Sequence, residues 1–313
     1  MKAKFIFSLA FFCTAKLLSQ DIDYISPTTN WLQLNPAYAG SNGGFRSQVN
    51  NCHSPGFYGT NQTGIANDLY LKKIKSGISL SLNNFNLGRG ILIENSFAIG
   101  YSKRIPVKKL EIMPALQITA LQRRLDINAL NFGDYIDARW NERFLDFTGG
   151  NLPATRKNVV DINFGALVKL SQAFVVGFTA KHITQPDVGL NGFAQMPAKY
   201  VVHASYDKVI NENSLISVLA WLTEQGGTEE AKLQTSVVLK KHLYTGLGAG
   251  VSNNYSSGLV NLGYRGNYWS VSVFLGTQYY PETKSFWNSS QLSISANIRD
   301  KEHRRTLTAL YSW

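Results

Sequence analysis

Hydrophobic and polar residues alternate along most of this chain with a period of two. The clearest examples are residues 78–83 and 160–166, where an apolar side chain occupies every second position. Residues 292–298 repeat the pattern, with serine and asparagine between the apolar positions. A period of two places one set of side chains on each face of a β-strand, so these strands lie between an apolar and a polar environment.

Strand length and aromatic placement favour a membrane barrel over a soluble sheet. Residues 268–279 place Trp269, Val273, Leu275 and Tyr279 on one face. The spacing from Trp269 to Tyr279 corresponds to about 33 Å along a strand, or about 23 Å across a bilayer at the usual tilt. That spacing matches an apolar band of about 25 Å between two aromatic girdles. Strands of a soluble barrel or sandwich, the alternative, are mostly shorter.

We therefore predict an all-β fold, a transmembrane antiparallel β-barrel of about 14 strands over residues 43–298. An even number is expected when both termini of the chain face the periplasm. Alternate connections are short, whereas those at 122–157, 182–198 and 280–288 are longer and are expected to be extracellular loops. The predicted strands are 43–50, 65–73, 76–86, 94–104, 110–120, 158–168, 172–181, 199–209, 214–223, 231–240, 242–252, 256–264, 267–279 and 289–298.

The two ends of the chain lie outside the predicted barrel. Residues 1–19 combine early lysines, an apolar run and small residues, which is typical of a signal peptide that directs export. Residues 299–313 are either a periplasmic tail, which the alternation of turn lengths favours, or a final strand.

The segment between the signal and the barrel, residues 20–42, is too short and polar to form a domain. The lumen of a barrel of about 14 strands is wide enough to be filled or to conduct. We expect this segment to fold into the lumen as a plug, with Tyr24, Trp31 and Tyr38 against lumen side chains.

Composition and charge further narrow the classes of protein and partner that fit this chain. Charged residues make up only 16% of the chain, which is sparse for a soluble protein of this size. The net charge is +11, but an exported barrel has no access to nucleic acid. Only Cys52 follows the signal, so no internal disulfide forms. Basic turns such as 72–75, 108–109 and 240–241 either contact lipid headgroups or bind acidic periplasmic partners.

A set of short motifs carries the strongest functional signal. The first comes just before the barrel and suits a kinked stretch outside a sheet, because Pro36 lacks an N–H group and Gly40 lacks a Cβ atom. The motif residues, in chain order, are Asn35, Pro36, Ala37, Tyr38, Ala39 and Gly40, then Arg46 and Gln48, Asp134, His182 and Pro186, and finally Pro197, Lys199, Tyr200 and His203.

Together these motifs resemble the PorP/SprF family of outer-membrane proteins associated with type IX secretion and gliding motility. The resemblance covers nearly everything after the signal, although a tryptophan usual after the Arg-x-Gln pair is missing and residues 299–313 look like an extension. It implies an outer-membrane component that helps to export, or holds at the surface, a large secreted adhesin-like protein through its C-terminal domain. Its further partners are type IX components and a periplasmic or peptidoglycan-bound protein. The alternative is a passive porin.

No catalytic, cofactor or metal site is predicted. His182 and His203 lack further ligands at zinc spacing, and we expect them to form hydrogen bonds within the loop and rim near Pro186, Lys199 and Tyr200. His53 and Ser54 lack a third residue to orient a hydrolase pair, so we expect no enzyme. Four aspartates lack the spacing of a calcium loop, namely Asp126, Asp134, Asp137 and Asp146.

Overall fold

The computed structural model describes residues 21, 23–55, 59–126, 155–190 and 192–299. The predicted signal peptide, the predicted site residue Asp134, most of the predicted loop 122–157 and residues 300–313 of the predicted tail or final strand lie outside the described residues. Among the described residues, no helix is long and apolar enough to cross a membrane.

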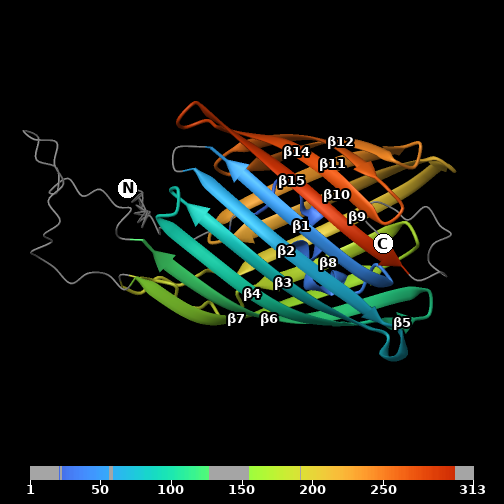
Figure 1. Cartoon of the computed structure of the whole chain (residues 1–313), viewed down its shortest axis with the longest axis horizontal. Coiled ribbons are helices and arrows are strands. Elements are labelled where there is room, and N and C mark those ends of the chain that lie inside the picture. The colour runs from blue at the N-terminus through green and yellow to red at the C-terminus, as the bar shows by residue number, and fades with distance from the viewer. Residues whose placement is uncertain (1–20, 22, 56–58, 127–154, 191, 300–313) are drawn as a thin grey trace, which may run out of the picture.

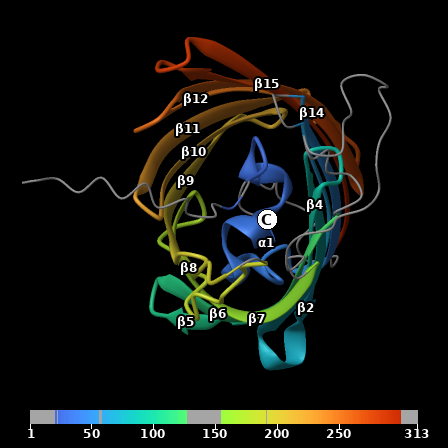
Figure 2. The same ribbon diagram turned by 90° about the vertical axis from the view of Figure 1, so that its left-hand side faces the viewer.

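Fourteen long antiparallel strands close into one barrel, which confirms the predicted fold (Figures 1 and 2). The barrel closes where β1 pairs with β15, and β4 pairs directly with β6 because the short β5 pairs only with the first residues of β6. The strands are β1 (Gly44–Ser54), β2 (Thr60–Leu71), β3 (Ser76–Leu87), β4 (Leu92–Lys103), β5 (Ile105–Val107), β6 (Leu110–Leu125), β7 (Arg156–Lys169), β8 (Phe174–Lys181), β9 (Lys199–Asn211), β10 (Ser214–Gln225), β11 (Thr228–Leu239), β12 (Leu243–Ser252), β13 (Ser256–Arg265), β14 (Trp269–Tyr280) and β15 (Ser285–Arg299).

The period of two becomes an inside and an outside of the barrel. On β3, Ile78, Leu80 and Leu82 are exposed on the outer surface, whereas Ser79 and Ser81 are buried towards the lumen. Such alternation of an apolar outer face with a polar inner face is the pattern of a barrel that spans lipid.

Several element boundaries differ from the sequence-based expectation. The predicted loop 280–288 is mostly strand, because β14 extends to Tyr280 and β15 begins at Ser285. Tyr279 pairs with Phe286 across this hairpin, and their rings lie 4.8 Å apart. Cross-strand aromatic pairs stabilise a sheet, which explains why the hairpin extends into this predicted loop.

Three short helical turns fill the interior of the barrel. They are η1 (Pro27–Thr29), α1 (Trp31–Leu34) and η2 (Pro36–Tyr38), and the view down the barrel shows them inside the ring of strands (Figure 2). Trp31 and Tyr38 pack against the inward-facing wall residues Met113, Leu167 and Leu219. Around Trp31 and Tyr38 the lumen wall is apolar, so the molecule has a hydrophobic core between the helical turns and the barrel.

Candidate functional site

Residues 21 and 23–42, here called the threaded segment, cross the lumen from one end of the barrel to the other. At the end that carries the connections 126–155 and 182–198, here the long-loop end, the backbone N–H of Asp21 donates to Gln225 at 3.0 Å. At the opposite end, here the short-turn end, the N–H of Gly40 donates to Asp68 near the end of β2 at 2.8 Å. The chain then enters β1.

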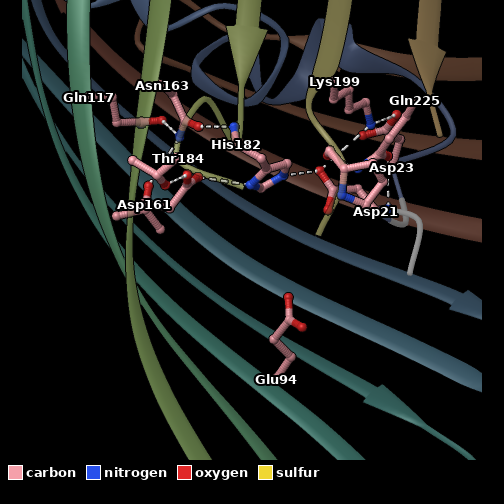
Figure 3. Close-up of polar contacts among 12 residues, drawn as sticks. Asp21, Asp23, Glu94, Gln117, Asp161, Asn163, His182, Thr184, Lys199 and Gln225 are labelled. Atoms are coloured by element: carbon pink, nitrogen blue, oxygen red, sulfur yellow. Dashed lines mark hydrogen bonds and ion pairs between the residues drawn. The ribbon is translucent and has the colours of Figure 1, made fainter. Parts of the chain in front are cut away.

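Buried charges hold the threaded segment at the long-loop end. The His182 ring lies between two carboxylates, with Nδ1 2.8 Å from Asp161 Oδ2 and Nε2 2.8 Å from Asp21 Oδ2 (Figure 3). Thr184 Oγ1 donates to the second Asp161 oxygen at 2.7 Å. Burial disfavours the imidazolium, but the carboxylates of Asp21 and Asp161 outweigh it and raise the pKa of His182 to about 9. His182 is therefore a cation at neutral pH.

Lys199 adds a second charged contact on the same side of the lumen. Its Nζ donates to Asp23 Oδ2 at 2.6 Å and lies 3.9 Å from Asp21 Oδ2, while its side chain is only 2% exposed. Burial raises the pKa of Asp21, yet the His182 and Lys199 cations outweigh burial and hold that pKa well below its ordinary value. We call Asp21, Asp23, Asp161, His182 and Lys199 the charged latch.

Asn35 joins the threaded segment to the barrel wall. Its Nδ2 donates to the backbone carbonyls of Ala166 on β7 and Phe178 on β8, both at 3.0 Å. Its Oδ1 accepts from the N–H of Ala37 at 2.9 Å and so caps η2, whose first residue is Pro36. An asparagine cap followed by proline is a favoured start for a helical turn.

Tyr38 brings two distant motifs together. Its ring stacks on His203 of β9 with 5.6 Å between ring centres and lies 4.8 Å from the ring of Trp31. His203 Nε2 is also 3.3 Å from Asn35 Nδ2. Tyr38 and His203 are each 1% exposed, so this contact belongs to the core of the plugged barrel.

Close backbone contact explains the small residues at the end of the first motif. Gly40 has φ +69°, and a Cβ atom on the facing Gly77 of β3 would lie 2.0 Å from the carbonyl oxygen of Ala39. That carbonyl accepts from Ser102 Oγ at 2.6 Å. Arg104 donates to the carbonyl of Gly40 at 2.8 Å. The backbone of the segment therefore lies directly on the wall.

Arg46 and Asp68 form a buried ion pair beneath the motif. Arg46 Nε donates to Asp68 Oδ1 at 2.7 Å, and Nη2 donates to the carbonyl of Tyr38 at 3.0 Å. Their side chains are 6% and 1% exposed. Because Asp68 also accepts from Gly40, one carboxylate organises both β1 and the threaded segment. The sequence signal for this role is that Asp68 is a carboxylate on the lumen face of β2.

The remaining motif residues lie in different parts of the barrel. Gln48 is buried in the lumen wall. The carbonyls of Pro186 and Pro197 accept hydrogen bonds from Met196 and Gln225. Tyr200 points outward, is 47% exposed and stacks on Phe178, so it belongs to the outer surface rather than to the lumen.

The side chains of the two predicted histidines contact the threaded segment, and the carbonyl of His182 also accepts a hydrogen bond within its own loop, from the N–H of Gln185 at 2.9 Å. His182 binds Asp21 and the wall residue Asp161, and His203 contacts Asn35 and Tyr38. In the described part of the chain, no three side chains of the metal-binding types come together to form a metal site.

Most of the lumen is filled, but a cavity of about 350 Å³ remains at the long-loop end. Cys52 borders it, together with aromatic and charged residues that include Asp23, Lys199, Glu230, Lys232, Tyr255, Tyr280 and Trp287. Tyr255 and Tyr280 lie 5.4 Å apart, and Trp287 lies 5.0 Å from Tyr280. Together, these contacts can hold the threaded segment in place. They leave a small cavity with polar and aromatic walls at the long-loop end.

A comparison of sequence families decides the identity of this plugged barrel. The sequence profile described as "Type IX secretion system membrane protein PorP/SprF" matches residues 18–296. The chain belongs to the PorP/SprF family. This confirms the resemblance that the motifs carried, and with the barrel fold it places the protein in the outer membrane. No curated protein gives a significant match.

Solved structures show where this PorP/SprF barrel stands among known folds. The CymD monoaromatic hydrocarbon channel is similar with a TM-score of 0.54 and 10% identity, over 87% of this chain and 93% of that chain. The Ralstonia pickettii toluene transporter TbuX is similar with a TM-score of 0.52 and 9% identity, over 86% of this chain and 93% of that chain. At such identities, the likeness concerns the fold alone.

Proposed function

We propose that this PorP/SprF protein is a non-enzymatic interaction component of type IX secretion. It helps to export, or holds at the cell surface, a large secreted adhesin-like protein by binding that protein's C-terminal domain. The observation that carries the proposal is the threaded segment, which is tethered at both ends and occupies the lumen. A lumen filled by the chain itself suits a protein that presents surfaces to partners more than one that passes solutes.

The two ends of the barrel suit different partners. The connections at the long-loop end face the cell exterior and contact the cargo, as expected for outer-membrane barrels. Exposed lysines occupy the short-turn end at 73–75, 108–109 and 240–241. There they contact lipid headgroups or an acidic periplasmic or peptidoglycan-bound partner, since both present negative charge.

Affinity purification of the tagged protein from its own outer membrane, in mild detergent, tests this proposal. The described loop at the long-loop end forms a small hairpin closed by a bridge between Asp187 and Gln195. Replacing residues 189–194 with glycine and serine alters this hairpin but spares His182 and Lys199. We expect the wild type to retain a large secreted protein and type IX components, and this variant to lose the secreted protein.

The matched control replaces residues 281–284, the β14–β15 turn at the same end of the barrel. This variant should keep its partners. A wild-type barrel that purifies without any secretion partner would overturn the proposal.

A passive channel is the second candidate, and the cavity of about 350 Å³ at the long-loop end favours it. The fold it shares with hydrocarbon channels is consistent with this candidate. Single-channel recording in planar bilayers separates the two. The interaction proposal expects little steady conductance while the threaded segment is in place, whereas large steady conductance of the wild type supports the channel.

A further inference from the structure

A row of polar side chains crosses the outer surface of the barrel. In successive strand pairs from β1 to β7, its members lie directly opposite one another, so they form one continuous line around this part of the wall. The row, here called the amide row, consists of Asn51, Thr63, Asn84, Asn95, Gln122 and Asn158.

Hydrogen bonds link the members of the amide row to one another. Asn51 Nδ2 donates to Thr63 Oγ1 at 2.8 Å, and Asn84 Nδ2 donates to Asn95 Oδ1 at 2.7 Å. Gln122 Nε2 donates to Asn158 Oδ1 at 3.0 Å. Polar groups that face hydrocarbon are unfavourable unless they are paired, so this network makes the row tolerable near lipid. It still leaves donors and acceptors available to an external polar group.

An apolar row lies two residues further along each strand, on the same outer face. It has the same register and consists of Val49, Ile65, Leu82, Phe97, Ala120 and Val160. Between the two rows runs a groove of about 760 Å³ that both rows line from β2 to β7.

Two arginines lie on the other side of the amide row. Arg124 of β6 and Arg156 of β7 are exposed and directly opposite each other, two residues beyond Gln122 and Asn158. Like charges in such a cross-strand pair repel. Within the described ranges neither arginine forms an ion pair with a carboxylate, and the adjacent Arg123 pairs with Glu94. Among the described residues the positive charge of this pair is unbalanced, and it attracts an anion.

We propose that this part of the outer wall binds a phosphorylated glycolipid of the outer leaflet. The arginines hold its phosphate, the amide row forms hydrogen bonds with its sugar and amide-linked head, and the apolar row packs along its acyl chains. The order of basic, amide and apolar rows along the strands matches the order of groups within one such amphiphile. The choice of the outer leaflet rests on the orientation proposed above.

The neighbouring strands show where the amide row ends. The register that contains Asn51 continues into Leu292 of β15 and Val273 of β14, which are both apolar and exposed. The register is apolar again at Leu262 of β13 and next holds a polar side chain at Thr245 of β12. The amide row is therefore an uninterrupted polar run only from β1 to β7.

Thermal unfolding of the purified protein in detergent, titrated with bis-phosphorylated lipid A, tests the site. Lipid A should raise the unfolding temperature of the wild type, and lipid A stripped of phosphate should not. In the R124Q/R156Q variant we expect an apparent affinity for lipid A weaker by about tenfold or more, since charge-assisted hydrogen bonds are lost. Without lipid A this variant should be at least as stable as the wild type, because a repulsive pair is removed.

Two further variants keep the test decisive. K240Q/K241Q removes the same charge from exposed lysines at the short-turn end and should respond to lipid A as the wild type does. N84L/N95L keeps both arginines but makes the amide row apolar, and it should weaken the response. Equal loss in R124Q/R156Q and K240Q/K241Q would overturn the proposal in favour of unspecific charge attraction. The proposal would also be overturned if lipid A left the unfolding temperature of the wild type unchanged while the wild type kept a protein partner on this wall.

The titration in detergent does not depend on orientation or on secretion. A barrel that binds lipid A at this wall but purifies without secretion partners would reject the proposed function and leave the site in place.

Discussion

The threaded segment is fixed by different physics at its two ends. At the long-loop end, Asp21 and Asp23 are held by His182 and Lys199, so the attachment depends on a histidine that titrates. At the short-turn end, the attachment consists of backbone contacts with Gly77 and the buried salt bridge between Arg46 and Asp68. The comparison teaches that the two attachments are independent, and that the one at the long-loop end depends on the protonation of His182.

The direction of the pH effect follows from the pKa of His182. Its folded-state pKa is about 9, above the ordinary value near 6.5. A group whose pKa is raised by folding contributes its full stabilisation at pH values below its unfolded-state pKa. That stabilisation is lost as the pH rises through its folded-state pKa. The charged latch therefore weakens between about pH 6.5 and 9.

Cys52 offers a built-in reporter for the long-loop half of the segment. It is the only cysteine after the predicted signal. Its side chain is 8% exposed and borders the cavity beside Tyr24 and Ile25. Displacement of the segment should therefore expose Cys52 to a maleimide reagent, whereas a change confined to the short-turn end should leave it protected.

The largest expected effect comes from breaking the Arg46–Asp68 pair. Arg46→Met leaves Asp68 charged and buried, which should cost about 3–5 kcal/mol of stability. A clear drop in the thermal unfolding temperature would report this cost. Cys52 should stay slow to label at pH 7, because the charged latch is intact.

The double variant R46M/D68L is the control for this effect, since removing both charges should restore part of the lost stability. Equal stability of R46M and the wild type would contradict the view that this pair fixes the short-turn end.

Raising the pH should weaken the attachment of the threaded segment at the long-loop end. Deprotonation of His182 removes at most about 3 kcal/mol, because each pKa unit corresponds to about 1.4 kcal/mol. We expect Cys52 labelling, corrected for the reactivity of a free thiol, to accelerate between pH 7 and pH 10. His182→Gln should label quickly already at pH 7 and lose the corrected pH dependence. A pH response that persists in H182Q would assign the effect to another group.

A smaller loss is expected from filling the space beside Gly77. Gly77→Ala puts a methyl group against the backbone of Ala39, and overpacking of this kind costs about 1–3 kcal/mol. Gly258→Ala is the matched control, because its added methyl group meets only a Thr277 side-chain atom at 3.8 Å. Unfolding temperatures of the two variants should differ clearly, and identical values would refute the close contact.

The smallest expected effect lies between the two ends. Thr179 Oγ1 donates to the carbonyl of Leu34 at 3.0 Å in a fully buried position. Thr179→Val should cost about 1 kcal/mol, the usual contribution of one hydrogen bond. Thr179→Ser keeps the hydroxyl group and should recover most of the stability. A neutral T179V would show that the middle of the segment is held by packing alone.

Much of the fold could be predicted from the sequence because alternation is a local property. The runs around Ile78 and Val160 specified strands with one apolar face, and the spacing from Trp269 to Tyr279 specified their length. The same local reasoning failed at 280–288, which was expected to be one of the longer extracellular loops. There, pairing of Tyr279 with Phe286 extends the hairpin, and a partner across a strand cannot be deduced from composition.

The candidate site was only partly accessible from the sequence. The motifs identified Asn35, Tyr38 and His203 as important, yet they could not show that these residues touch. Asp161 and Asp68 looked like ordinary polar positions on the lumen side of their strands. Their roles appear only once the threaded segment brings Asp21 and Gly40 to them.

By itself, the sequence determined that this protein is an outer-membrane barrel of the PorP/SprF type, since periodicity, strand length and motif order are all written along the chain. Only the tertiary structure decided which residues meet inside the barrel and which meet on its outer wall. Closure of the barrel sets which residues from distant strands share the lumen and which share a row on the outer wall. Contacts such as His182 with Asp21, or Arg124 opposite Arg156, depend on that closure and on the register of the strands.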